Sequence, residues 1–213
     1  MIRTSLVVLT LLTSALAASG KLERIERPAT SSVADAVWQE LDSKGYRLTL
    51  DDGSTYDLWL RKSLTVSKSK DAEGVLFPEI AQSTLLGVIS FPKPATDFRG
   101  QPIKAGFYNL RYELLPNDGN HLGVAPSRDF VLAIPAEADP DPTTQYKFEQ
   151  LVNLSRKTTG TQHPAPLSLV QADSAIPGLS KDDQDHWIFS VKLPAASGEG
   201  IPIGIIVKGT APQ

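Results

Sequence analysis

Apolar and polar residues alternate in several short runs, and this pattern predicts a mainly β chain. In the run GFYNLRYEL, residues 106–114, one set of alternate positions is apolar and the other is mostly polar. A period of two indicates an antiparallel strand with one face in the core. Pro116 ends this strand because proline cannot extend the hydrogen-bonded ladder, and residues 129–134 form a second apolar run. We therefore expect two strands joined by a loop of about a dozen residues, which is long enough to carry function.

The strongest short-range signal predicts a β-hairpin. Residues 46–51 and 55–62 both alternate, and the Asp-Gly-Ser sequence at 52–54 suits a tight turn between them. Trp59 interrupts the polar face of this hairpin, so its side chain either covers a second layer or is exposed. Further strands are expected at residues 75–77, 85–91, 166–171, 186–193 and 203–207.

The pattern also predicts two helices. Ser32 suits the start of the first, over residues 33–41, and apolar side chains recur at three and four residues in the second, over residues 145–157. Gly160 follows the second helix, where a C-terminal glycine is common. The charged residues 19–31 show no apolar period, so we expect them to form an exposed lead-in.

The first 17 residues have the pattern of a secretory signal peptide. Arg3 precedes an apolar run that begins at Leu6, and Ala15 and Ala17 stand in an A-x-A arrangement, so cleavage is expected after Ala17 or Ala18. No cysteine follows the run, which excludes a lipid anchor on cysteine, and no later stretch is long and apolar enough to cross a bilayer. The sequence predicts an exported protein, either periplasmic or extracellular.

Composition narrows the fold class and the partners. The chain has 21 basic and 24 acidic residues, and removing residues 1–17 deletes only Arg3, which leaves 20 against 24 and a net charge of −4. This mild acidity without basic clusters argues against nucleic acid and anionic membranes as partners. All 16 prolines and 15 glycines follow the signal peptide, spread between short apolar runs as in sandwiches and barrels.

These observations predict one folded domain. Because the chain has no cysteine, its core must hold the fold without disulfides. We expect a single antiparallel β-sandwich of jelly-roll type with one or two short helices. A lead-in at residues 18–45 would precede the β-sandwich domain at residues 46–209.

The three histidines are the first candidates for site chemistry. His121, His163 and His186 each lie in or beside a predicted loop, and three imidazoles could hold zinc. A further ligand could be Asp118, Asp129 or Asp185. They are not spaced as paired ligands, so a metal site would depend on the fold. The alternative is that they lie on the surface or brace loops. No cofactor motif occurs in the sequence, and no cofactor is expected.

Two runs of aspartates are candidates for calcium. Asp51, Asp52 and Asp57 form the first run, and residues 182–185 contain the second. Neither run has the regular ligand spacing of a calcium loop. Acidic residues near turns also solubilise and cap, and this is the interpretation that we favour.

Aromatic side chains and one arginine provide candidates for binding. Trp59, Tyr108 and Trp187 lie on predicted strands, where exposed rings could stack on a sugar or cover a partner's apolar surface. The alternative, which we favour, is that they fill the core. Arg128 and Asp129 directly follow the long loop, as a pair that either fixes the loop or clamps a ligand. No G-x-S-x-G nucleophile elbow occurs, so a non-catalytic role is favoured over an enzyme.

Three runs resemble a family of uncharacterised exported proteins of environmental bacteria. They are GVLFPEIAQSTLLGVISFP, RGQPIKAGFYNLRYELLPNDGNHLGVAPSRDFVLAIPA and LSRKTTGTQHPAPLSL, and the resemblance covers most of the mature chain. Because that family has no assigned activity, the resemblance implies export and a solitary domain but no catalytic residue. The shorter run AGFYNLRY is also similar to a strand of transthyretin-like secreted β-sandwich modules.

Three functions fit these observations. The first is a non-catalytic binding module for an unknown small molecule, glycan or protein, at a site rimmed by the loops 117–128 and 161–166. Its candidate ligand-binding residues are Asp118, His121, Arg128, His163 and Trp59. The second is a metal-dependent enzyme or metal-binding protein that uses His121 and His163. The third is a structural subunit of a surface assembly, in which the apolar strand 203–207 pairs with a partner chain.

Overall fold

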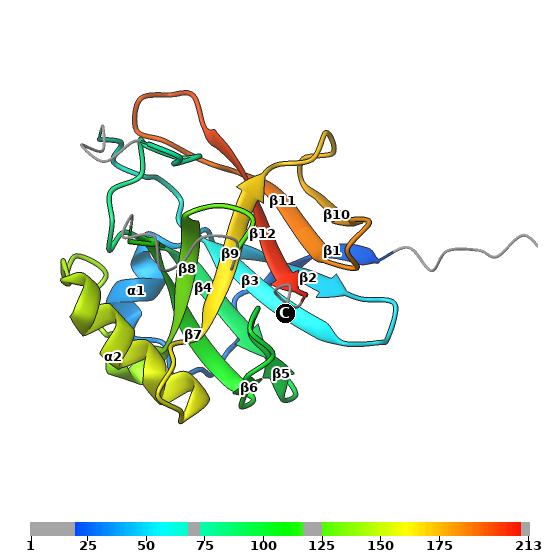
Figure 1. Ribbon diagram of the computed structural model, residues 1–213, viewed down its shortest axis with the longest axis horizontal. Coiled ribbons are helices and arrows are strands. Elements are labelled where there is room, and N and C mark those ends of the chain that lie inside the picture. Colours follow the sequence, from blue (N-terminus) through cyan, green and yellow to red (C-terminus); the bar gives the residue numbers. More distant parts are fainter. Residues whose placement is uncertain (1–19, 68–72, 117–124, 210–213) are drawn as a thin grey trace, which may run out of the picture.

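The fold is a large antiparallel sheet that nearly closes into a barrel (Figure 1). The computed structural model describes residues 20–67, 73–116 and 125–209, so the predicted signal peptide lies outside the described residues. Within these ranges ten strands form one sheet, and two short strands form a separate hairpin. The mainly β class is therefore confirmed. The ten strands belong to a single curved sheet, and this replaces the expectation of two facing sheets.

Most strands lie next to their neighbours in sequence. The sheet order is β1-β2-β3-β4-β7-β8-β9-β12-β11-β10, and every pairing in it is antiparallel. The strands are β1 (Lys21–Glu26), β2 (Lys44–Thr49), β3 (Thr55–Leu60), β4 (Leu85–Phe91), β5 (Ala95–Thr96), β6 (Pro102–Ile103), β7 (Gly106–Leu114), β8 (Asp129–Pro135), β9 (Pro166–Gln171), β10 (Gly178–Lys181), β11 (Trp187–Leu193) and β12 (Ile201–Lys208). The helices are α1 (Asp35–Glu40), the short 3-10 helix η1 (Ala136–Ala138) and α2 (Phe148–Thr159).

Several predicted elements are confirmed. The hairpin forms as β2 and β3, with Thr49 opposite Thr55, and the two runs around the long loop form β7 and β8. Helices α1 and α2 form within a few residues of their expected bounds. The strand expected at residues 75–77 does not form, and Phe77 is instead buried in the barrel core.

The N-terminal segment differs from the exposed lead-in that its charges predicted. Lys21–Glu26 is strand β1, paired along its whole length with β2. Its side chains are mostly exposed because it is an edge strand, and only Leu22 and Ile25 are partly buried. A second unexpected strand, Gly178–Lys181, lies between the strands expected at residues 166–171 and 186–193. The sheet therefore begins at Lys21, ahead of the boundary expected at residue 46.

The barrel is filled with side chains. Inward-facing residues such as Leu58, Ile89, Leu110 and Phe189 are completely buried in one cluster drawn from both halves of the sheet. Side chains therefore fill the space that this nearly closed sheet surrounds. Ligands must therefore be sought at the ends of the barrel or along its outer surface.

Helix α1 covers part of the outer surface and settles the position of Trp59. The Trp59 side chain is 2% exposed, and its ring lies edge-on to that of Trp38 on α1, with 5.4 Å between ring centroids. The sequence left open whether the Trp59 side chain covers a second layer or is exposed, and the first alternative is confirmed. Because Trp59 is buried, it cannot stack on a ligand at the surface, which corrects its inclusion among the binding residues.

Both faces of β7 are buried, whereas its alternation predicted one solvent-exposed face. Asn109, Arg111 and Glu113 lie on the polar face, and all three are at most 1% exposed. The segment after β8 covers this face, and helix α2 packs on the neighbouring strand β8. Arg111 donates two hydrogen bonds to the Asp139 carboxylate, at 2.8 Å and 2.7 Å, so the polar residues of β7 bind the covering segment.

Candidate functional site

Long-range ion pairs close one end of the seam between β1–β2 and β10–β11. Lys181 on β10 lies 3.2 Å from a carboxylate oxygen of Asp51 in the β2–β3 turn, and Lys208 at the end of β12 pairs with Asp52. The hydrogen bond from Lys208 lowers the pKa of Asp52 to about 2. We call these two ion pairs the latch. Next to the latch, Gly20 lies directly against the ring of Trp187.

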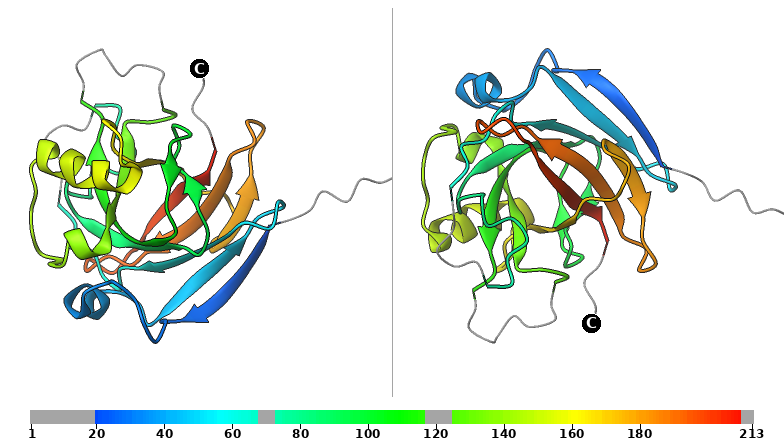
Figure 2. Two further views of the ribbon diagram at one scale, coloured as in Figure 1. Left: turned by 90° about the horizontal axis from the view of Figure 1, so that it is seen from below. Right: turned by 90° about the horizontal axis from the view of Figure 1, so that it is seen from above.

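Beyond the latch the seam is open. The first residue of β10, Gly178, lies opposite Ser190 on β11. Strand β11 continues past this point to Leu193. Within the described ranges, residues 191–193 therefore have a strand neighbour only on the β12 side. Leu64 forms a bridge with Ala195 just past the end of β11 and bounds the opening there. The two views in Figure 2 show β1 and β2 diverging from β10 and β11.

A hollow of about 330 Å³ lies in this open part of the seam, between β1–β2 on one side and the end of β11 on the other. Tyr46, Leu60 and Val191 supply its apolar lining. The Tyr46 ring is half-buried and lies 5.1 Å from that of Phe189, centroid to centroid, which holds it in place. The volume is in the range of small-molecule sites in proteins.

Cationic side chains outnumber carboxylates around the hollow. Arg24, Lys44, Arg61 and Lys192 line it, and Asp42 is the one lining carboxylate among the described residues. Lys192 is exposed and forms no ion pair or hydrogen bond with the part of the chain that the structure describes. Glu26 and Glu40 pair with two of these cations just outside the lining, so the four cations face three carboxylates, and the surplus positive charge is that of Lys192.

The other lining cations are held by ion pairs at the rim. The Arg24–Asp42 and Lys44–Glu26 pairs are exposed and contribute little stability, so a ligand can compete for these two cations at small cost, whereas the Arg61 side chain is only 18% exposed. The guanidinium of Arg24 also lies 4.2 Å from the centroid of the Tyr46 ring. The three pairs are Arg24–Asp42 at 3.6 Å, Lys44–Glu26 at 3.2 Å and Arg61–Glu40 at 3.0 Å.

Two further hollows adjoin the first. Lys192 and Pro194 also line one of about 490 Å³ that continues to Gly200. A Cβ on Gly200 would lie 2.7 Å from the Lys192 Cγ, so the glycine leaves room for the lysine stem. Arg61 joins the first hollow to one of about 320 Å³, whose lining includes the hydroxyl of Thr65. The three hollows share lining residues and surround the open end of the seam with both apolar and polar groups.

Arg128 and His163, which were expected to share one site, lie toward opposite ends of β8. Arg128 directly precedes β8, whereas His163 lies in the loop that leads into β9 beside the other half of β8. Strand β8 is about 20 Å long at 3.3 Å per residue, so these two side chains do not converge. His163 is exposed. Asp118 and His121 lie outside the described residues.

Arg128 and Asp129 make contacts that fix neighbouring segments. The buried Asp129 carboxylate accepts hydrogen bonds from the backbone N–H groups of residues 76–77 and from the Tyr112 hydroxyl, the last at 2.6 Å. This interaction and burial raise the pKa of Tyr112, with burial the larger cause. Arg128 donates to the carbonyl oxygen of Leu115. These contacts support the loop-fixing alternative for the pair over the ligand clamp.

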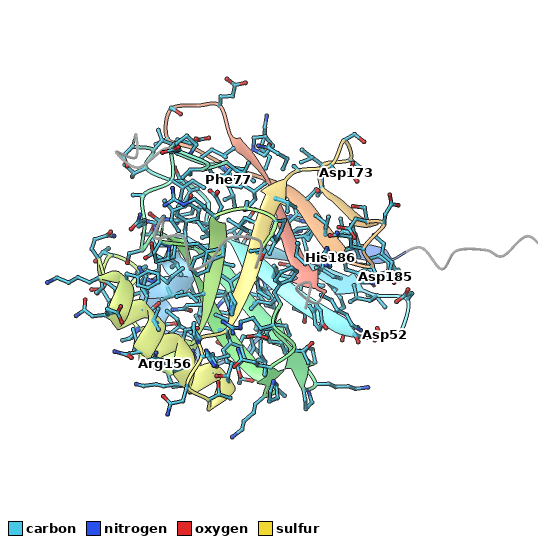
Figure 3. All side chains as sticks on the ribbon, viewed as in Figure 1. Asp52, Phe77, Arg156, Asp173, Asp185 and His186 are labelled. Atoms are coloured by element: carbon cyan, nitrogen blue, oxygen red, sulfur yellow. The ribbon has the colours of Figure 1, made fainter. Side chains whose placement is uncertain are left out.

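The third histidine and the aspartate runs are engaged in the fold. His186 is buried, with its Nδ1 atom 3.0 Å from Asp182 and its ring 5.3 Å from that of Phe98. Asp52 and Asp185, which lie on the same side of the barrel as His186 (Figure 3), each pair with a lysine. Within the described ranges, no group of three or more histidines and carboxylates is arranged to hold a metal ion.

Comparisons with protein-family models, with curated proteins and with solved structures find no match for this chain. The described residues also include no helix long and apolar enough to cross a membrane. The candidate site therefore rests on geometry alone. Sequence reasoning missed it because Lys192 looks like an ordinary outward-facing residue of an alternating strand. Lys192 borders a hollow because β10 pairs with β11 only as far as Ser190, and this can be seen only in the structure.

Proposed function

We propose that this is an exported, non-catalytic binding protein that holds a small carboxylate-bearing ligand in the open seam. The observation that carries the proposal is Lys192, a cation without an acidic partner among the described residues, at the rim of a hollow of about 330 Å³. A ligand carboxylate at this position would gain a charge-assisted hydrogen bond. Export rests on the apolar N-terminal run, and the destination is periplasmic or extracellular.

The lining also defines the rest of the ligand. Tyr46 and Val191 present apolar surface below the charged rim, so a compact apolar or aromatic body would be buried against them. Binding sites commonly combine an apolar lining with a few polar groups that orient the ligand. The ligand that fits these features is a small apolar acid, with its carboxylate toward Lys192 and Arg61.

The first prediction is that apolar carboxylates bind at the seam through Lys192. Benzoate and hexanoate are the probes, and benzamide and hexanamide are their uncharged counterparts. Chemical-shift mapping should place the acids beside Tyr46 and Val191, and the amides should bind more weakly. Lys192→Ala should weaken binding of the acids roughly tenfold, the equivalent of one charge-assisted hydrogen bond of about 1.4 kcal/mol.

The matched control is Lys157→Ala, which removes an exposed lysine from α2, far from the seam in sequence and fold. It should leave binding unchanged. Shifts that map elsewhere on the barrel, or equal binding of acids and amides, would contradict the proposed site. Loss of binding in both lysine variants would indicate a general effect of net charge.

A further inference from the structure

Strand β1 presents a free edge over much of its length. Within the described ranges it pairs with β2 and with no other strand. Its first residues approach β10 and β11, where Gly20 touches Trp187, but β1 diverges from there. The backbone groups on the outer side of residues 23–26 therefore have no strand partner. Such an edge is a template for pairing with another chain.

We propose that a second copy of this chain pairs with β1, antiparallel and about a two-fold axis, with Ile25 opposite Ile25. A two-fold pairing places the same surface of both copies in contact. Residues directly opposite each other in an antiparallel pair have their side chains on the same face of the sheet. Because side chains alternate between the faces along a strand, the numbers of two opposed residues must differ by an even number. This restricts the pairing to a small set of registers. The proposal does not rest on the ligand proposed for the seam, although Arg24 also lines the hollow there.

Charge selects one register from this set. With Ile25 at the centre, Arg24 of each copy lies opposite Glu26 of the other, and Glu23 lies opposite Arg27, the residue directly after β1. Opposite charges meet at four positions and the two isoleucines meet at the axis. Opposite-charge and apolar pairs both stabilise antiparallel strands.

The neighbouring registers are unfavourable. Centring the pair on Glu23 places two glutamates opposite each other, and centring it on Arg24 places two arginines opposite each other. Like charges directly opposite destabilise a strand pair. A register centred on Leu22 would use the part of β1 that already lies against β10 and β11 through Gly20. The free part of the edge and its charges therefore favour the same centre.

The charged groups can form the new pairs without a large loss. Arg24 and Glu26 are each in one intrachain ion pair, with Asp42 at 3.6 Å and with Lys44 at 3.2 Å. All four side chains are 45% or more exposed, so solvent already screens these pairs. Charged residues on an edge often prevent association. On β1 their signs are self-complementary, so they admit one partner in one register.

The test of the surface is a charge exchange between residues 24 and 26. Sedimentation equilibrium of the purified protein should show a weak dimer, since a strand pair of this length buries less surface than a standard interface. Glu26→Lys, which places a lysine opposite Arg24, should weaken dimerisation at least tenfold. Combining it with Arg24→Glu should restore the dimer. The double variant restores neither intrachain pair, so recovery reports on contacts between copies.

The test of the register uses cysteine, which the native chain lacks entirely. Ile25→Cys places two thiols opposite each other at the axis, within the Cα separation that a disulfide requires. Mild oxidation should link this variant into a covalent dimer, and the Arg24→Cys control should link far less. A protein that stays monomeric at millimolar concentration overturns the proposal. So does a dimer that Glu26→Lys leaves intact or that Arg24→Cys cross-links equally well.

Discussion

At the scale of single residues, Glu113 is a buried acid that has no countercharge among the described residues. It is 1% exposed on the covered face of β7, and its carboxylate accepts a hydrogen bond from the N–H of Leu114 at 2.9 Å. Burial raises the pKa of Glu113 to about 7, and the hydrogen bond offsets only part of this effect. The folded protein therefore holds a proton on Glu113 at pH values where the unfolded chain has released it.

This difference makes stability depend on pH. Because the folded-state pKa of Glu113 is raised, the folded state binds more protons between about pH 4.5 and pH 7, so stability should fall as pH rises through this window. Glu113→Gln should match the native protein at pH 4 and exceed it above pH 7, by up to about 3 kcal/mol. Urea unfolding at several pH values measures the difference. An equal pH dependence in both proteins would show that Glu113 is not the group responsible.

At the scale of elements, a buried ion pair attaches the connection between β8 and α2 to the sheet. Arg111 on β7 binds the Asp139 carboxylate with two nitrogens, and both side chains are fully buried. Asn109 and Tyr146 also donate to Asp139. Arg111 donates further to the carbonyl oxygens of Ser83, Asp141 and Thr144.

Removing one partner should therefore be costly. Asp139→Ala leaves the Arg111 guanidinium buried without its countercharge, and breaking a buried pair in this way typically costs about 3–5 kcal/mol. Chemical denaturation should show this loss. Lys21→Ala, which breaks an exposed ion pair with Glu23, is the control and should change stability by less than about 1 kcal/mol. A loss of similar size in both variants would contradict the role of burial.

At the scale of the whole molecule, local signals predicted the elements better than their assembly. The Asp-Gly-Ser turn at 52–54 and the apolar spacing of α2 depend on near neighbours, and both predictions were confirmed. The sandwich was expected because alternation indicates which face of a strand is buried but not how a sheet curves. Residues 21–26 were expected to belong to an exposed lead-in because they are charged and lack an apolar period. An edge strand with exposed side chains has the same pattern. The seam could not be predicted, since it depends on where β10 ends relative to β11.

The latch also has a consequence for the order of folding. Its partners, Lys181 with Asp51 and Lys208 with Asp52, are separated by 130 and 156 residues. Contacts at such separation carry a large loop-closure cost, so we expect the barrel to close after the hairpins have formed.

Interactions that form after the transition state mainly slow unfolding. The variant Lys181→Ala with Lys208→Ala should therefore unfold up to roughly fivefold faster and refold at the native rate. Stopped-flow kinetics in urea measures both rates, with Lys157→Ala as the control. Slower refolding of the double variant would instead mean that the β2–β3 turn meets β10 and β12 early. If the expected result holds, the β2–β3 hairpin and the C-terminal strands β10 and β12, though each is paired within its own part of the sheet, are the last parts of the barrel to be joined.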